Sequence, residues 1–457
     1  MGNFLVRPLS SSRGSGPKSR SSISCHLTPR YTHTRADIYG SYFYHAHARG
    51  QIDDGCYGPI TIRPKYGIVN PFDMISRTDL KLLEAAEARA APLVISDWRH
   101  TTSIQTWGLE QAAGTESALC VDSLLVNGKG AVDCWSREDL TKYTSPAVAS
   151  VLQHANLSIT DKGCVPPDGM AILLPTPGLN ISAIPPSVFD VCTPTQGYRE
   201  VIKAPSSKKW MALNIISSAA IGTFAVSFDE HPIWVFAVDG HYIEPLQVEA
   251  LILSNGERYS IFIQLDKPCS NYAIRIASLS LPQLISTTAV LSYETAEPPN
   301  GSYPGTVTSK PYINQAGVNM TADVVFFNQA EMLRKLANSD SPLLYQDPHA
   351  INIGANLTIA TKNNTWVDLI FQVKSLGQPP HPIHKHSNKG FIIGQGEGNF
   401  TWNSVAEAAS EIPENFTLAL PPYRDGFITP ATAIGPTWLA VRYHVVNPGA
   451  FLLHCYI

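Results

Sequence analysis

The stretch His381-Pro-Ile-His384-Lys-His386 places three histidines within six residues. Imidazole is the commonest side-chain metal ligand near neutral pH, so this cluster predicts a metal site. Pro382 favours an extended backbone, in which successive side chains point to opposite faces. His384 and His386 then share one face, about 6.6 Å apart along the strand, while His381 points to the other. One strand would supply two metal sites; the alternative is a solvated or engineered histidine run.

The last nine residues, Gly449-Ala-Phe-Leu-Leu-His454-Cys455-Tyr456-Ile457, end an apolar run with an imidazole beside a thiol. If this segment is a strand, alternation sends Cys455 to one face and His454 and Tyr456 to the other. The faces then match those of the histidine run: Cys455 with His381, and His454 with His384 and His386. A site built from His and Cys, one peptide bond from a multi-imidazole site, is expected for blue-copper electron transfer into a copper cluster.

A second histidine pair lies in the segment Gly40–Pro59, where His45-Ala-His47 follows a β-type run. This spacing puts both rings on one face, as is needed to hold one or two metal ions. Taken alone, such a pair is as often structural as functional.

The composition indicates a strand-rich protein of two or three domains. Of the 457 residues only 15% are charged, and 35 are Pro and 18 are Tyr, whereas helical bundles usually contain more Lys, Glu and Ala. The net charge of -4 gives no general attraction to nucleic acid or to anionic membranes. No apolar run approaches the roughly 20 residues that span a bilayer. We expect a soluble monomer with neither nucleic-acid nor membrane partners.

Short β-type runs separated by Pro, Gly, Asn and Asp predict all-β Greek-key sandwiches or barrels. The clearest runs are Ser41–His45, Pro59–Arg63, Pro92–Ser96, Trp234–Val238, Tyr259–Gln264, Trp366–Phe371 and Trp438–Tyr443. The clearest helix candidate is Leu80–Ala90. A Pro/Gly/Ser-rich stretch, Glu297–Pro311, is the best linker candidate, and a weaker boundary lies near residues 64–75. We therefore predict domains at 25–66, 67–298 and 299–457, with residues 1–24 disordered or not native to the protein.

Cysteines and sequons indicate an oxidising compartment. The eight cysteines are dispersed without a CxxC pair, which argues against a zinc ribbon and permits disulfides. The eight N-x-S/T sequons are at Asn156, Asn180, Asn300, Asn319, Asn356, Asn363, Asn399 and Asn415. Residues 1–24 conflict with this, because their eight Ser and four Lys or Arg surround no apolar core of a signal peptide. A transit peptide remains an alternative; we expect a secreted glycoprotein.

From about residue 25 to the end, the chain resembles a fungal multicopper oxidase of the laccase-like group. The three metal-ligand segments carry the resemblance, and five further stretches support it: Val94–Trp98, Asp122–Gly130, Asp229–Gly240, Gly256–Tyr259 and Pro421–Gly426. The resemblance implies tandem cupredoxin-like domains, the first of them incomplete. It also implies copper as the cofactor, in type 1, type 2 and type 3 sites.

The resemblance also implies roles for individual residues. His381 and Cys455 would bind the type 1 copper and His384 the type 2 copper. The paired type 3 coppers would be bound by His45, His47, His386 and His454. Asp54 matches an acidic residue that helps to deliver protons to dioxygen, although a turn carboxylate is an equal alternative. Asp229 or Glu230 matches a carboxylate near the reducing substrate, and a surface-loop role is the alternative for both.

The chain departs from the family pattern of ten histidines and one cysteine. Seven of those eleven ligands occur here. No His-x-His motif precedes Gly40, and we expect His26 and His33 to be ordinary histidines. Tyr456 stands where the terminal motif has a second histidine, and a phenol is a poor replacement for imidazole on copper. The last type 1 histidine, together with the axial residue, would lie beyond Ile457, so we expect a chain truncated at both ends.

Three functions remain open. The first is an oxidase that oxidises phenolic or aromatic donors and reduces dioxygen to water. The second is a non-catalytic remnant that retains weak copper binding through His45, His47, His384 and His386. The third is a ferroxidase-type enzyme with ferrous iron as the donor. Because four ligands are absent, the sequence leaves it uncertain whether this chain is itself an enzyme.

Overall fold

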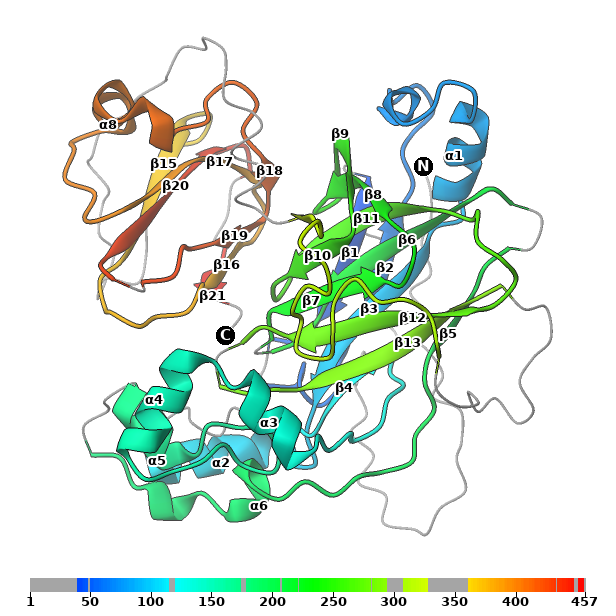
Figure 1. Cartoon of the computed structure of the whole chain (residues 1–457). Coiled ribbons are helices and arrows are strands. Elements are labelled where there is room, and N and C mark those ends of the chain that lie inside the picture. Colours follow the sequence, from blue (N-terminus) through cyan, green and yellow to red (C-terminus); the bar gives the residue numbers. More distant parts are fainter. Residues whose placement is uncertain are drawn as a thin grey trace, which may run out of the picture. The chain divides into compact units, whose positions relative to one another are not determined.

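The computed structural model describes residues 39–47, 50–114, 120–173, 178–205, 208–220, 222–280, 282–293, 307–327, 361–432, 434–447 and 451–455. The chain divides into two compact units (Figure 1). Unit 1 contains residues 1–249 and 258–324, and unit 2 contains residues 250–257 and 325–457. The predicted disordered segment 1–24, part of the predicted linker and Tyr456 lie outside the described residues. The boundaries predicted at 25–66, 67–298 and 299–457 stay a prediction.

Unit 1 contains two sheets and a hairpin. One sheet has the order β4-β3-β6-β11-β8-β9. Its strands are β3 (Ala91–Trp98), β4 (Ser123–Val126), β6 (Trp210–Ser217), β8 (Ile233–Val238), β9 (His241–Val248) and β11 (Arg258–Gln264). The unit 1 strands of the other sheet run in the order β7-β12-β13-β5: β5 (Val201–Lys203), β7 (Phe224–Phe228), β12 (Asn271–Ser278) and β13 (Ser286–Ser292). Strands β1 (Gly40–His45) and β2 (Tyr57–Ile62) form an antiparallel hairpin.

The core of unit 1 explains why these runs form strands. All eight residues of β6 are buried, as expected of a central strand that is covered on both faces. Phe72, in the 3-10 helix η1 (Phe72–Met74), packs edge-on against Phe236 and Phe262. Helix α1 (Leu80–Glu87) buries Leu83 and Ala86 in the same cluster. The helix predicted at 80–90 is therefore confirmed.

A helical segment between β3 and β5 was not predicted. It comprises α2 (Ser103–Ala113), α3 (Arg137–Tyr143), α4 (Pro146–His154), α5 (Pro167–Leu173), η2 (Ile181–Ala183) and α6 (Pro186–Phe189). Helices α3 to α5 share a small core that includes Leu140, Leu152 and Met170. Disulfides Cys120–Cys164 and Cys134–Cys192 also stabilise the segment. Such short helices have little stability alone, so local packing and cross-links supply it.

Unit 2 contains two sheets and a short parallel pair. Strands β15 (Trp366–Val373), β20 (Thr437–His444), β17 (Gly390–Glu397) and β18 (Tyr423–Arg424) form an antiparallel sheet in that order. The other sheet has the order β19 (Gly426–Ile428), β16 (Pro382–Lys385), β21 (Leu453–Cys455). Strands β10 (Ala250–Leu253) and β14 (Phe326–Phe327) pair in parallel. Helix α8 (Val405–Glu411) and η4 (Pro413–Asn415) pack near the fully buried Trp438.

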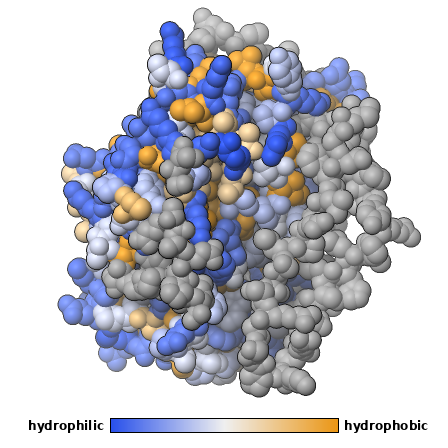
Figure 2. Space-filling view, turned by 90° about the vertical axis from the view of Figure 1, so that its right-hand side faces the viewer, coloured by the Kyte–Doolittle hydropathy of each residue, from blue (hydrophilic) through white to orange (hydrophobic). Residues whose placement is uncertain are grey.

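All seven predicted β-type runs fall on strands, and the prediction of a mostly β fold is confirmed. Most of the described surface seen in Figure 2 is hydrophilic, with smaller hydrophobic patches. Among the described residues, no helix has both the length and the hydropathy needed to cross a membrane.

Candidate metal centre

The strand pair β16–β21 holds the two ligand segments of unit 2 together. The strands are antiparallel, with Ile383 opposite Cys455 and His384 opposite His454. Residues that face each other across an antiparallel pair share one face of the sheet. The register therefore puts His384 and His454 on one face. Cys455 lies on the other face with Ile383, and His381, two residues before Ile383, belongs to that face as well. The two-face arrangement predicted from the sequence is confirmed.

One face carries a thiol and an imidazole. The Sγ atom of Cys455 lies 3.7 Å from Nδ1 of His381. Nε2 of His381 lies 3.3 Å from Oε1 of Gln378, and an N–H there would leave the Nδ1 lone pair directed at the sulfur. Partial burial lowers the pKa of His381 and so favours the neutral imidazole that binds metals. The backbone of His381 is fixed by a bond from its N–H to Thr429 Oγ1, at 2.9 Å.

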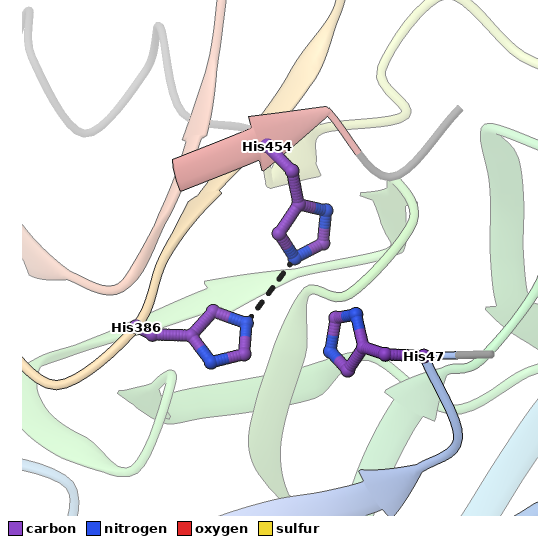
Figure 3. A group of neighbouring side chains, drawn as sticks. All are labelled: His47, His386 and His454. Carbon is purple, nitrogen blue, oxygen red and sulfur yellow. Dashed lines mark hydrogen bonds between the residues drawn. The ribbon is translucent and has the colours of Figure 1, made fainter. Parts of the chain in front are cut away.

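The opposite face carries three imidazoles. Ring centroids lie 4.8 Å apart for His384 and His386, 5.6 Å for His384 and His454, and 5.4 Å for His386 and His454. Nε2 of His386 lies 3.3 Å from Nε2 of His454, as Figure 3 shows. Nδ1 of His384 lies 2.9 Å from the Asp425 carbonyl oxygen, and Nδ1 of His454 lies 2.9 Å from that of Cys455. With Nδ1–H donated to a carbonyl, Nε2 is the nitrogen that can bind a metal.

The histidine pair of unit 1 lies at the end of β1. The ring centroids of His45 and His47 are 4.5 Å apart, so the predicted shared face is confirmed. The hairpin positions the first ring, because His45 pairs with Tyr57 and the Ala46 N–H donates to the Cys56 carbonyl at 3.0 Å. Nδ1 of His45 also lies 3.3 Å from the Ala46 carbonyl oxygen.

Asp54 makes contacts typical of a structural carboxylate. Its Oδ1 accepts the backbone N–H of Ser103 at 2.9 Å, and its Oδ2 accepts the Ser103 hydroxyl at 2.5 Å. Ser103 is the first residue of α2, where the backbone N–H groups have no partner within the helix. The carboxylate therefore satisfies one of these donors. Its predicted role in proton delivery stays a prediction.

The neighbouring Asp53 was not predicted as a site residue. Burial raises its pKa to about 6; Arg99 opposes this shift, and the carboxylates of Asp97 and Asp54 add to it. Its ion pair with Arg99 is long, with Arg99 Nη1 3.6 Å from Oδ2. The only signal in the sequence was the doubled acid before Gly55. Gln378 was missed as well, because its role depends on a contact with His381.

The two remaining predicted carboxylates make structural contacts. Asp229 is fully buried, and its carboxylate accepts two parallel bonds from Arg275 at 2.8 and 2.9 Å and one from the Ser309 hydroxyl at 2.7 Å. Glu230 has a positive φ of 62°, and its Oε1 accepts the Lys310 N–H at 2.8 Å. Their predicted role near a reducing substrate stays a prediction.

The side chains on and directly beside β16 and β21 fit copper. A thiol with imidazoles is the donor set that soft and borderline transition metals prefer. On the imidazole face, backbone carbonyls hold the opposite ring nitrogens of two histidines, which is the outer support that metal-binding histidines usually have. A metal at these positions would bind through His384, His386 and His454 on one face and through His381 and Cys455 on the other.

Three models of the multicopper oxidase family match the chain, over residues 14–67, 89–296 and 320–457. A multicopper oxidase of Phaeosphaeria nodorum, elcG, is 38% identical over 93% of this chain and 74% of its own length. A laccase of Aspergillus fumigatus, abr2, is 36% identical over 93% of this chain and 76% of its own. Laccase-1 of Emericella nidulans is 34% identical over 93% of this chain and 78% of its own length.

A solved structure shows the same fold. The crystal structure of a laccase from Botrytis aclada aligns with a TM-score of 0.54 and 18% identity, covering 92% of this chain and 67% of that chain. This likeness extends the relationship from sequence to architecture. The chain therefore belongs to the multicopper oxidase family, whose members are copper-dependent oxidoreductases.

Proposed function

We propose that this chain oxidises phenolic or other aromatic donors on the His381–Cys455 face and passes electrons to the imidazole face, where dioxygen is reduced to water. One observation supports the proposal: two different sets of donor side chains lie on opposite faces of a single strand pair, and the consecutive residues Cys455 and His454 link them. Copper supplies the one-electron redox chemistry when it is bound.

The side chains of the two faces have separate roles. The Cys455 thiolate and His381 would hold the copper that accepts electrons, and the peptide bond to His454 gives a short covalent path to the second face. His384, His386 and His454 would hold, through Nε2, the copper that reduces dioxygen. The resemblance implies that His45 and His47 of unit 1 are copper ligands as well. The Asp425 carbonyl keeps the His384 ring in one orientation and one tautomer.

Two names among the relatives support the donor class. The Aspergillus fumigatus and Emericella nidulans proteins are both called laccases, and we transfer the phenolic or aromatic donor from them to this chain. Its disulfides are typical of secreted proteins, which supports extracellular localisation. We also propose that it acts as a monomer.

A second candidate is copper binding without turnover. It is favoured by Tyr456, which follows Cys455 where the family pattern has a histidine. A phenol binds copper less well than imidazole, so the oxygen-reducing site would be filled incompletely. This candidate retains the thiolate site and loses dioxygen reduction.

Copper reconstitution separates the two candidates. The full chain is loaded with copper, and its visible spectrum, copper content and oxygen uptake with a phenol are measured. We expect an intense thiolate-to-copper absorption band, which Cys455→Ser abolishes and which the exposed-site control His154→Ala leaves unchanged, together with oxygen uptake that depends on the phenol. A band without oxygen uptake selects the second candidate. Absence of the band from a folded, copper-treated chain contradicts both candidates. Oxygen uptake with ferrous iron but not with the phenol would identify ferrous iron as the donor.

A further inference from the structure

Unit 1 contains a cavity of about 320 Å³ that includes none of the proposed copper ligands. It lies over the paired strands β12 and β13, where Arg275 is opposite Thr288. The segment that begins α3 contributes Asp133, Trp135 and Asp139, and a loop contributes Asn314 and Gln315. The volume is near the lower end of the range of about 300–1,000 Å³ for small-molecule sites.

The wall of the cavity is cross-linked. Cys134 lies in the lining and is joined to Cys192 by a disulfide. The indole of Trp135 packs against the core of α3 to α5 and contacts Tyr143 edge-on, with centroids 6.2 Å apart. A site that is preformed loses less conformational freedom on binding. The cavity is therefore suited to a small ligand, whose few contacts could not offset the cost of ordering a flexible site.

Charges in the lining are largely compensated within the protein. Arg275 makes its parallel bonds to the buried Asp229, and Asp133 forms an ion pair with Arg199. Asp139 accepts the Ser136 hydroxyl at 2.9 Å and lies in the first turn of α3, where a carboxylate is favourable. The remaining charge is slightly negative, so the cavity disfavours anions.

Neutral polar groups line the same cavity as the indole. Oδ1 of Asn314 accepts the N–H groups of Ala316 at 2.8 Å and Val318 at 3.0 Å, which fixes the side-chain amide and makes its NH₂ group the available donor. Gln315 and Thr288 add an amide and a hydroxyl, each of which both donates and accepts. A cavity lined by an indole together with donors and acceptors matches a ligand that has apolar C–H faces and many hydroxyl groups.

We propose that this cavity binds one unit of a neutral or basic carbohydrate, with a sugar ring against Trp135 and its hydroxyls bonded to Thr288, Asn314 and Gln315. Three sources share this chemistry: a free sugar, a polysaccharide, and an N-glycan of the chain itself. The exposed sequon residue Asn319 is paired with Ile313, next to Asn314, so a glycan there would begin beside the cavity.

The test uses the full chain without added copper, so its result is independent of the oxidase proposal. Saturation-transfer NMR is recorded with methyl glucoside, methyl mannoside, N-acetylglucosamine and glucosamine at about 10 mM, with glucuronate as the anionic comparison and a phenol as the aromatic one. Oligosaccharides of the sugar that binds test the polysaccharide source. We expect transfer to at least one neutral or basic sugar and none to glucuronate.

Variants assign the binding to the cavity. Gln315→Ala and Thr288→Val should each weaken binding by about 2- to 10-fold, as expected for one lost hydrogen bond. Gln153→Ala on the exposed face of α4 is the matched control and should bind like the parent. If glycosylated protein binds no added sugar but Asn319→Gln does, the protein's own glycan is the occupant. The proposal is overturned if no sugar binds to the Asn319→Gln chain, if only the phenol binds, or if the cavity variants bind unchanged.

Discussion

The strand pair β16–β21 and the turn at residues 50–55 both carry residues that sequence reasoning selected, and the two regions behave differently. On the strands, alternation alone placed Cys455 with His381 and His454 with His384. In the turn, the adjacent carboxylates of Asp53 and Asp54 lie in different environments. Asp54 accepts two bonds from Ser103, whereas Asp53 is half-buried near Asp97, with Arg99 Nη1 3.6 Å from its Oδ2.

The difference comes from what fixes a side chain. In a strand, direction follows from a two-residue period, and the register of one pair then sets all its neighbours. In a turn, direction follows from local dihedral angles and from whatever segment packs against it. Here that segment is the start of α2, 49 residues further along the chain. Sequence spacing can therefore support a ligand set on strands, but cannot choose between two neighbouring acids in a turn.

The largest effect is expected when the imidazole face of the strand pair loses one of its ligands. His454→Ala should leave the thiolate absorption of Cys455 in place, because His381 and the sulfur remain together. Copper content should fall and phenol-dependent oxygen uptake should drop by at least about 100-fold, since even loss of an outer-shell partner of a ligand costs roughly 10–100-fold. Spectra and metal analysis on the same sample check this. Loss of both signals together would show that the two faces are not separate sites.

A smaller effect is expected when the support of a ligand is removed. Gln378→Leu deletes the amide oxygen that lies 3.3 Å from Nε2 of His381. The affinity for copper on the thiol face should fall by about 10–100-fold, while the imidazole face keeps its metal. Gln378→Glu retains an acceptor and should restore most of the affinity. Equal losses in both variants would assign the effect to packing and not to the hydrogen bond.

The sequence predicted the strands of both units because alternating β-branched and aromatic runs ended at Pro, Gly and Asn. It also predicted which histidines share a face. It missed the helices between residues 103 and 189, although Thr102 and Gln105 form a capping box that is visible in the sequence. Those helices are short and depend on a local core and on disulfides, and the pairing of cysteines could not be read from their spacing.

The carboxylates of the candidate site were the least predictable part. Asp229 was selected because of its place in a family pattern, yet its partners Arg275 and Ser309 are 46 and 80 residues away. The role of a single acid depends on burial and on distant partners, neither of which has a period in the sequence. The ligand histidines were easier because regular backbone fixes them.

Removing the helix-capping acid should destabilise unit 1. Asp54→Asn keeps an oxygen for one Ser103 donor but loses the charge and one acceptor, so we expect the free energy of unfolding to fall by about 1–2 kcal/mol. Urea denaturation of the copper-free chain measures this. Ser103→Ala removes only the hydroxyl and should cost less. If Asp54→Asn leaves unfolding unchanged but lowers phenol-dependent oxygen uptake at every pH, the proton-delivery role is favoured over the structural one.

The smallest expected effect is a rise, and not a fall, in the free energy of unfolding. The pKa of Asp53 is about 6 in the folded chain, above its ordinary value of 3.8. An unfolded chain releases this proton at lower pH than the folded chain, so ionisation favours unfolding increasingly from pH 3.8 to about 6 and fully above it. Asp53→Asn should therefore raise the free energy of unfolding by about 1 kcal/mol at pH 7, a value discounted for partial exposure, and should add nothing below pH 3.8. Unfolding curves at several pH values check this. A gain that is the same at all pH values would show that the amide makes a new contact. A loss at pH 7 would show that the ion pair with Arg99 outweighs burial, and the two acids of the turn would then be alike.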